Sequence, residues 1–178
     1  MNKYGILGWP LERSYSPIIH TFLLKHASIE GKYELIRMNE INNKNIDQIN
    51  KSYSGYNITI PYKEKILEVC EEAHLDVHVK KIGSVNTVKN KDGVTSFYNT
   101  DYLGFLNFLE IINFNPEGRK IMILGSGGSS KSINYALNLI KSQATIISRT
   151  NKEEAISYQD LNESCLLYTS DAADESRG

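Results

Sequence analysis

The sequence predicts an α/β protein built from two modules, and two observations support this prediction. From Tyr4 to Ile112, short apolar runs typical of strands alternate with longer runs whose apolar residues recur at helical spacing. Further on, an apolar run, a glycine-rich turn, a helical run and a second apolar run follow one another. This order is that of a βαβ unit, in which a helix connects two parallel strands.

The glycine-rich turn of this unit has the features of a dinucleotide site. Lys120–Leu124 predicts a buried strand and Ala144–Ser148 a second one. Gly125 permits a tight turn, Gly127 lets the backbone approach a ligand, and the helix N-terminus that follows offers N–H groups to a pyrophosphate. The third position of the glycine pattern holds Ser130, which is small enough for close packing. The alternative is a flexible glycine loop without a ligand.

The end of the second strand favours NADP over NAD. NAD sites usually place Asp or Glu about 20 residues after the glycines, where the carboxylate binds the ribose 2′-hydroxyl. This chain has Ser148-Arg149-Thr150 there, with Lys152 close behind, and these groups suit a 2′-phosphate that a carboxylate would repel. A solvated surface arginine is the alternative. The predicted cofactor-binding residues are Gly125, Gly127, Gly128, Ser129, Ser148, Arg149, Thr150 and Lys152.

The composition excludes several classes of partner. At 178 residues, with 40% apolar and 23% charged residues, the chain is an ordinary globular protein of one large or two small domains. A net charge of −1 gives no reason to expect nucleic acid or an anionic membrane as partner, and no apolar run is long enough to span a bilayer. Cys70 and Cys165 are too far apart for a metal-ligand pattern. We expect a cytoplasmic protein without a metal.

The first strand and helix enclose a loop with two serines. Tyr4–Gly8 predicts a short strand, and Pro17 opens a helix whose apolar face carries Ile18, Ile19, Phe22 and Leu23. Ser16 before Pro17 is a typical N-cap followed by an N1 proline, and capping alone accounts for it. Ser14 has no such role, so two hydroxyls in a strand-to-helix loop suggest a polyol or carboxylate site.

The next segments lead to a lysine at a helix start. Lys32–Met38 has strand character, Glu40–Ser52 is a polar helix or loop, and Tyr56–Ile60 alternates with Ile58 and Ile60 on one face. Pro61 ends this strand, so Lys63 falls in the first turn of a helix, where the dipole disfavours a cation. Such a lysine is suited to proton transfer. The alternative is a solvated lysine beside Glu64 and Lys65.

The remainder of the first module contains an unusual asparagine. Gly83–Val88 predicts a strand interrupted by Asn86, a residue that strands disfavour and that therefore needs a turn or a ligand. Asp92-Gly93 predicts a two-residue hairpin turn. A helix follows Asn99-Thr100-Asp101; Thr100 or Asp101 could simply cap it, and capping is the simplest role of an isolated Asp here. The turn residues Asn115–Gly118 form the best internal boundary.

Taken together, these segments resemble the shikimate dehydrogenase family from Tyr4 to about Asn162. The segments that carry the resemblance occur in the family's order and spacing. They are Gly8-x-Pro10, Ser14-x-Ser16-Pro17-x-x-His20, Asn57-x-Thr59-x-Pro61-Tyr62-Lys63, Gly83-Ser84-Val85-Asn86-Thr87, Asn99-Thr100-Asp101, the glycine turn and Ser148-Arg149-Thr150.

The resemblance implies a fold, an activity and a set of site residues. The fold is an N-terminal α/β substrate-binding domain, residues 1–101, followed by the start of a Rossmann NADP-binding domain, residues 102–163, which is truncated here. The activity is NADPH-dependent, reversible reduction of 3-dehydroshikimate to shikimate, in the pathway to chorismate and the aromatic amino acids. Lys63 and Asp101 match the catalytic residues of the family. The matching substrate contacts are Ser14, Ser16, Thr59, Lys63, Asn86 and Asp101.

The chain also departs from the family pattern. Arg13 stands where the family usually has His, Ser148 replaces an Asn, and Glu153 stands where a further basic residue often follows. The family's chain continues well beyond this one, so we expect weak or no activity from the 178 residues. Residues 164–178 show no family pattern, and we expect an artefactual or disordered tail.

Two other functions remain open at this stage. One is a quinate/shikimate dehydrogenase with relaxed use of NAD and NADP, which turnover of quinate and of NAD would reveal. The other is a non-catalytic, ligand-binding remnant of the same fold. In each case the expected partner is a small-molecule substrate and the expected state a monomer or homodimer.

Overall fold

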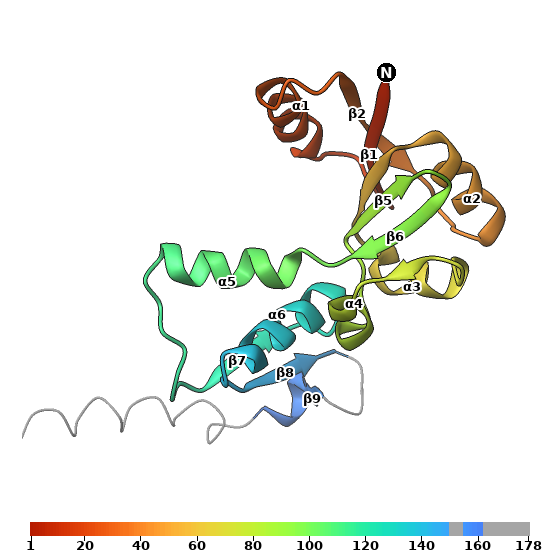
Figure 1. Ribbon diagram of the computed structural model, residues 1–178. Helices are drawn as coiled ribbons and strands as arrows, with labels where there is room; N and C mark the ends of the chain where they lie inside the picture. The colour runs from red at the N-terminus through yellow and green to blue at the C-terminus, as the bar shows by residue number, and fades with distance from the viewer. Residues whose placement is uncertain (150–154, 162–178) are drawn as a thin grey trace, which may run out of the picture. The chain divides into compact units, whose positions relative to one another are not determined.

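The computed structural model describes residues 1–149 and 155–161, and this part of the chain divides into compact units (Figure 1). The first unit is Met1–Asp101 and the second is Tyr102–Gly178. The boundary falls between Asp101 and Tyr102, where the resemblance divides the chain, and not at the turn Asn115–Gly118. The helix before the turn belongs to the second unit, where its Tyr102 packs edge-to-face on Tyr135. The assignment of substrate to one unit and NADP to the other remains a prediction.

The first unit contains a mixed sheet with the strand order β2-β1-β3-β5-β6-β4. Strand β1 is parallel to β2 and β3, β5 is antiparallel to β3 and β6, and the short β4 is parallel to β6. The strands are β1 (Asn2–Gly8), β2 (Gly31–Arg37), β3 (Gly55–Ile58), β4 (His74–Leu75), β5 (Thr87–Lys91) and β6 (Val94–Tyr98). The helices are α1 (Ser16–His26), α2 (Asn43–Ser52), α3 (Tyr62–Val69) and α4 (Val77–Ile82).

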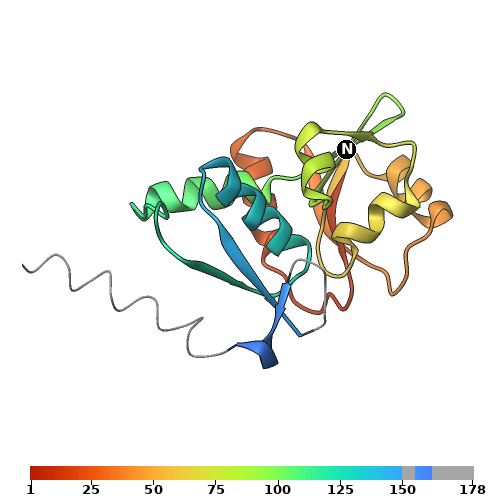
Figure 2. The same ribbon diagram turned by 90° about the horizontal axis from the view of Figure 1, so that it is seen from below.

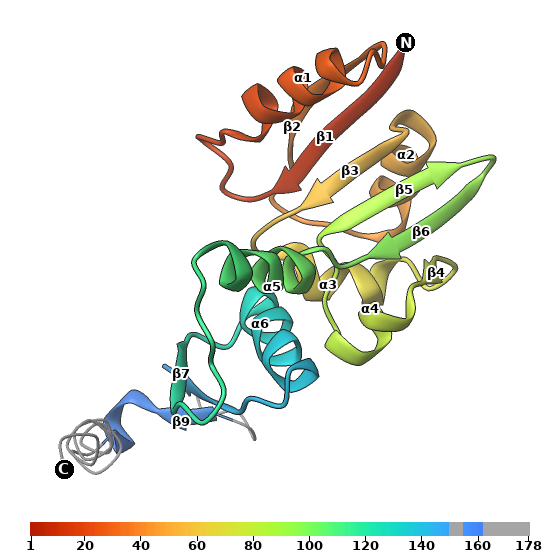
Figure 3. The same ribbon diagram turned by 60° about the vertical axis from the view of Figure 1, so that its left-hand side comes forward.

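The main core lies on one face of this sheet, beneath α2, α3 and α4 (Figures 1 and 3). Because successive residues of a strand point to opposite faces, Leu7 and Ile58 enter this core, whereas Ile6 and Asn57 face the other side. That other face carries a smaller cluster around Ile6 and Tyr33 and is the side of α1. The sheet thus separates the core from a face on which polar side chains can be arranged.

Helix α1 differs from its predicted packing. Its pattern predicts a buried apolar face, but no residue of α1 is buried, and Ile18 and Phe22 are 70% and 67% exposed. The helix contacts the sheet mainly through Leu24 and through His20, whose ring stacks on Tyr33 at 4.3 Å. Periodicity indicates which side of a helix is apolar, but not whether another element covers that side.

Several strand boundaries also differ from those predicted. Strand β3 ends at Ile58, so Ile60 lies in the turn before α3 and is 72% exposed instead of sharing the core with Ile58. The predicted strand Gly83–Val88 begins only at Thr87, because Gly83 ends α4 in the left-handed conformation. Helix α4 and strand β4 were not predicted from the sequence. The hairpin turn Asp92-Gly93 is confirmed, with positive φ angles of 51° and 77°.

The second unit contains the predicted βαβ arrangement. Its elements are α5 (Asp101–Ile111), which starts at the last residue of the first unit, β7 (Ile121–Leu124), α6 (Gly128–Leu139), β8 (Ala144–Ser148), β9 (Ala155–Ser157) and a 3₁₀ turn (Tyr158–Asp160). The parallel sheet has the order β7-β8-β9, with α6 packed against β7 and β8 (Figure 2). Strand β7 is less buried than predicted, because Met122 and Leu124 remain exposed and only Ile123 is buried.

Within the described residues, no helix has the length and apolar character needed to cross a membrane. The predicted tail, residues 164–178, lies outside the described residues.

We predict that Gly8→Ala destabilises the first unit. A Cβ at Gly8 would collide with Cγ2 of Thr59 and lie 3.0 Å from the carbonyl oxygen of Ile60, so the turn before α3 would have to move. We expect the free energy of unfolding to fall by about 1–3 kcal/mol in urea denaturation. Gly104→Ala in α5 is the control, because a Cβ there meets nothing within 4 Å and should be neutral or stabilising. Equal effects of the two substitutions would contradict this account.

The partial burial of His20 should make the free energy of unfolding fall at acidic pH. Burial lowers the pKa of His20 below its ordinary value of 6.5, so the unfolded chain takes up the proton more readily than the folded one. Stability from this group is therefore present above pH 6.5 and is lost as the pH falls through the folded-state pKa. His20→Phe keeps an aromatic ring against Tyr33 but cannot titrate. We expect urea midpoints of the variant to fall less between about pH 6.5 and about pH 5, and identical slopes would contradict the prediction.

Candidate active site

The centre of the site is an ion pair between the two residues predicted to be catalytic. Lys63 Nζ lies 2.8 Å from Asp101 Oδ2, and the two side chains are 15% and 29% exposed. Both residues belong to the first unit although they are far apart in sequence. Partial burial strengthens the attraction between such charges, but it also makes the loss of either partner costly.

The backbone holds Lys63 at the start of α3. The helix begins after Pro61, which has no side-chain capping bond, so Lys63 falls in the first turn as predicted. The carbonyl oxygen of Lys63 accepts a hydrogen bond of 2.7 Å from the N–H of Val85. Next to it, the N–H of Ile58 donates to the carbonyl oxygen of Asn86 at 2.8 Å. The loop before β5 is therefore tied to both β3 and α3.

Asn86 connects this loop to Asp101. Its side chain is 8% exposed, and its Oδ1 accepts a bond of 2.8 Å from the N–H of Thr100. Since a backbone N–H can only donate, this contact fixes the orientation of the amide. Nδ2 then donates to Asp101 Oδ1 at 2.7 Å and to Thr100 Oγ1 at 2.9 Å. The sequence predicts a local turn or a ligand for Asn86; in the structure its side chain bonds residues at the start of α5, which are distant in sequence.

Asp101 does not cap α5. Its own N–H donates to Asn99 Oδ1 at 3.1 Å, and its carboxylate is turned to Asn86 and Lys63. Asn99 in turn donates to the carbonyl oxygen of Ser84 at 2.8 Å. Asn99 thus accepts from the first N–H of α5, while both carboxylate oxygens of Asp101 bond side chains.

The two predicted serines lie where the loop after β1 meets α1. Ser16 is the first residue of α1 and not its N-cap, because Tyr15 holds that position without a side-chain bond. Ser14 is not the N-cap either, but its Oγ accepts a bond of 3.2 Å from the N–H of Ser16. Thr59 lies in the turn between β3 and α3, with its N–H bonded to the carbonyl oxygen of Leu7 at 2.9 Å.

The polar network also includes Tyr33 and Asn57, to which the sequence assigned no individual role. Tyr33 donates to Asn57 Oδ1 at 2.7 Å, and Asn57 Nδ2 contacts Thr87 Oγ1 at 3.3 Å. The alternation of β3 places Asn57 on the polar face, and this signal could have identified it. Tyr33 gave no signal, because an aromatic residue in a strand is typical of a core.

The glycine turn of the second unit has the predicted local structure. Gly125 has a φ of 117°, and its N–H donates to the carbonyl oxygen of Ile147 at 2.7 Å. Gly127 is the N-cap of α6, has no side-chain capping bond and is exposed, and a Cβ there would meet nothing within 4 Å. Gly128 and Ser129 form the first turn of α6. The backbone of this turn is therefore accessible to a phosphate group, which the fingerprint requires.

The residues predicted to choose NADP are only partly described. Ser148 is buried at the end of β8, and its hydroxyl lies 2.8 Å from that of Ser126 in the glycine turn. Arg149 follows and is exposed. Thr150 and Lys152 lie outside the described residues.

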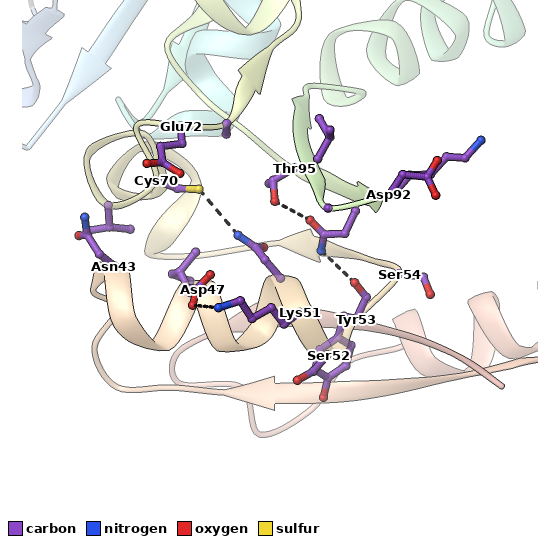
Figure 4. A pocket seen from close by; sticks show the side chains of 18 of the residues that line it. Asn43, Asp47, Lys51, Ser52, Tyr53, Ser54, Cys70, Glu72, Asp92 and Thr95 are labelled. Atoms are coloured by element: carbon purple, nitrogen blue, oxygen red, sulfur yellow. Dashed lines mark hydrogen bonds and ion pairs between the residues drawn. The ribbon is translucent and has the colours of Figure 1, made fainter.

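A cavity of about 910 Å³ in the first unit contains none of the predicted site residues (Figure 4). It lies between α2, the end of α3 and the β5–β6 hairpin. Several of its polar groups bond to one another, as in the pair Lys51–Asp47 and the bond from Thr95 to Asn90. Burial raises the pKa of the Cys70 thiol, which disfavours the reactive thiolate. Among the described residues, no group of three or more metal-ligating side chains is placed to hold a metal ion.

The two units carry two different kinds of candidate site. An α/β unit carries a paired lysine and aspartate in a polar network, and a βαβ unit follows with a glycine turn suited to a dinucleotide. Residues 6–88 match the family described as "Shikimate dehydrogenase substrate binding domain".

Several known shikimate dehydrogenases are similar to most of this chain. The "Shikimate dehydrogenase (NADP(+))" of Clostridium perfringens is 36% identical over 174 residues, which are 94% of this chain and 62% of that protein. That of Alkaliphilus metalliredigens is 39% identical over 153 residues, 82% of this chain and 51% of the relative. Shikimate dehydrogenase 1 of Peptoclostridium difficile has a crystal structure with a TM-score of 0.78 and 31% identity, covering 89% of this chain and 61% of that one.

A further solved structure was obtained with both ligands. Shikimate 5-dehydrogenase of Thermus thermophilus in complex with NADP(H) and shikimate has a TM-score of 0.76 and 30% identity. The match covers 84% of this chain and 57% of that one. Residues 6–88 thus match the substrate-binding domain of this family, and most of the chain is similar to its members, as the motifs predict. The chain spans between about half and 62% of the length of the curated relatives cited above. The predicted fold class is confirmed as well.

We predict that Asn86→Ala lowers the free energy of unfolding more than Asn90→Ala does. The substitution leaves the N–H of Thr100 and one oxygen of Asp101 without their partner in a partly buried site. We expect a loss of about 1–3 kcal/mol in the free energy of unfolding, measured in urea. Asn90→Ala is the control, because Asn90 makes side-chain bonds to Tyr53 and Thr95 but contacts no ion pair. The prediction is wrong if both variants lose the same amount.

Proposed function

We propose that this chain carries the substrate site and the beginning of the cofactor site of an NADP-dependent shikimate dehydrogenase. The reaction is the reversible reduction of 3-dehydroshikimate to shikimate, with Lys63 and Asp101 as catalytic residues. The observation that carries the proposal is the 2.8 Å ion pair between these side chains, held by Asn86. The names of the relatives supply the substrate class and the cofactor.

In this proposal Lys63 supplies the proton. Reduction of a ketone places negative charge on its oxygen, and a positioned acid lowers the barrier by donating to that atom. NADPH, when bound, supplies the hydride. Asp101 orients the Lys63 ammonium through Oδ2, while the bond from Asn86 to Oδ1 keeps the carboxylate from rotating away. A site that only bound a ligand would not require this arrangement.

The hydroxyl groups of the first unit suit a carboxylated polyol. Ser14 and Ser16, in the loop that leads into α1, are proposed to bind the substrate carboxylate. Thr59 and Asn86 are proposed to contact the substrate from the two segments that flank Lys63. Hydroxyl and amide groups can donate and accept, so they match a ligand that carries both hydroxyl and carboxylate groups.

NADP fits the glycine turn of the second unit. The pyrophosphate would lie at the accessible backbone of Gly125, Gly127 and Gly128 and at Ser129, where the N-terminus of α6 favours negative charge. Ser148, the last residue of β8, and Arg149 after it would hold the 2′-phosphate, with Thr150 and Lys152 as further proposed contacts.

We predict that Lys63→Met lowers the rate of shikimate-dependent NADP reduction by about 10²- to 10⁴-fold, because the proton donor is lost. The unsubstituted chain should bind shikimate in calorimetry and show weak turnover, since it spans at most 62% of the first curated relative. Lys65→Met, at an exposed position of the same helix, is the control and should keep the rate within about twofold. Failure of the unsubstituted chain to bind shikimate, or an unchanged rate in Lys63→Met, would refute the proposed function.

A further inference from the structure

Two residues without an assigned role connect the ends of the proposed substrate site. Tyr33 on β2 and Asn57 on β3 flank β1 and lie on the same face of the sheet, opposite the main core. Tyr33 is 9% exposed, and its hydroxyl donates to Asn57 Oδ1 at 2.7 Å. This bond crosses the central strand β1, so both ends are fixed by the sheet itself.

The hydrogen bonds that continue from Asn57 have a single direction. Asn57 Nδ2 lies 3.3 Å from the carbonyl oxygen of Asn86, which can only accept, and this contact fixes the orientation of the Asn57 amide. Nδ2 also donates to Thr87 Oγ1 at 3.3 Å, and the Thr87 hydroxyl donates to Asn86 Oδ1 at 3.0 Å. Asn86 Nδ2 then donates to Asp101, which accepts from Lys63 on its other oxygen.

At the other end, Tyr33 contacts α1, the helix whose first residue is Ser16. The Tyr33 hydroxyl donates to Asn57, and burial raises the pKa of Tyr33. His20 from α1 stacks on the Tyr33 ring at 4.3 Å and limits its rotation.

We propose that Tyr33 and Asn57 are positioning residues that couple α1, whose first residue Ser16 lies at the proposed carboxylate end of the site, to the Lys63–Asp101 pair at its reacting end. This inference rests on the proposed function. An unbroken row of hydrogen bonds along a sheet face allows little independent movement of its ends. The distance between the carboxylate-binding hydroxyl and the proton donor is then set by β1, β2 and β3 instead of by two separate loops, which gives the precision that proton transfer requires.

The structure offers a closely matched pair of variants to test this coupling. Tyr33→Phe removes the hydroxyl that donates to Asn57 and keeps the ring that stacks on His20. Tyr56→Phe on β3 removes an equivalent bond, because Tyr56 is 3% exposed and its hydroxyl donates to Asn50 Oδ1 at 2.8 Å. Tyr56 faces the main core, away from the proposed site. The two substitutions should therefore have similar costs in stability and differ in their effect on the site.

The first measurement is calorimetric binding of shikimate to the unsubstituted chain and to each variant. We expect Tyr33→Phe to weaken binding about tenfold and Tyr56→Phe to change it less than about twofold, with similar urea midpoints for the two variants. If both variants bind shikimate as the unsubstituted chain does, or are weakened equally, Tyr33 is only a structural residue and the inference is wrong.

A second measurement needs no substrate and separates this inference from the proposed function. In ¹⁵N-labelled protein, Tyr33→Phe should shift the side-chain amide signals of Asn86 as well as those of Asn57, because Thr87 and Asn57 transmit the change. Tyr56→Phe should leave both sets unchanged and shift Asn50. If Tyr33→Phe leaves Asn86 unaffected, the coupling is refuted whether or not shikimate binds. If the unsubstituted chain does not bind shikimate but Asn86 responds, the proposed function fails and the coupling stands.

Discussion

The site of the first unit depends on a carboxylate that is bonded on both oxygens. Asp101 accepts from Lys63 on Oδ2 and from Asn86 on Oδ1, and neither side chain of the ion pair is fully solvated. A charged pair in such a place is favourable only when its remaining hydrogen-bonding groups have partners. The neighbouring backbone N–H groups have partners as well, because the side chain of Asn99 accepts from the N–H of Asp101 and that of Asn86 accepts from the N–H of Thr100. The start of α5 is therefore organised around the ion pair.

The six-stranded sheet allows this site to exist beside a well-packed core. One face takes up the apolar side chains of β1, β3, β5 and β6, together with α2, α3 and α4. The opposite face can then carry Tyr33 and Asn57 without exposing the core to water. Stability and chemistry are thus assigned to different faces of the same strands, which explains how a strand residue such as Asn57 is accommodated despite its low strand propensity.

The second unit contributes a different kind of site, made by the backbone instead of by charged side chains. Gly125 and Gly127 keep the turn before α6 accessible, and Ser126 and Ser148 join the turn to the end of β8 through their hydroxyls. Such a turn binds a phosphate through N–H groups and the helix dipole, so its function depends on local conformation. The proposed reaction needs both kinds of site, because one binds the substrate and the other the hydride donor.

The sequence by itself determined the features that depend on local rules. The βαβ order, the Asp92-Gly93 hairpin and the place of Lys63 in a first helical turn follow from periodicity, turn preference and proline, which act over a few residues. The family motifs also pointed to Asp101 and Asn86, but their spacing alone could not show which atoms meet.

Only the tertiary structure decided the long-range features. It showed that the apolar face of α1 is exposed and that Asp101 meets Asn86 and Lys63. It also brought Tyr33 to Asn57 across β1. These outcomes depend on which segments become neighbours after the sheet has formed, and burial and hydrogen bonding between distant segments leave no periodic signal in the sequence.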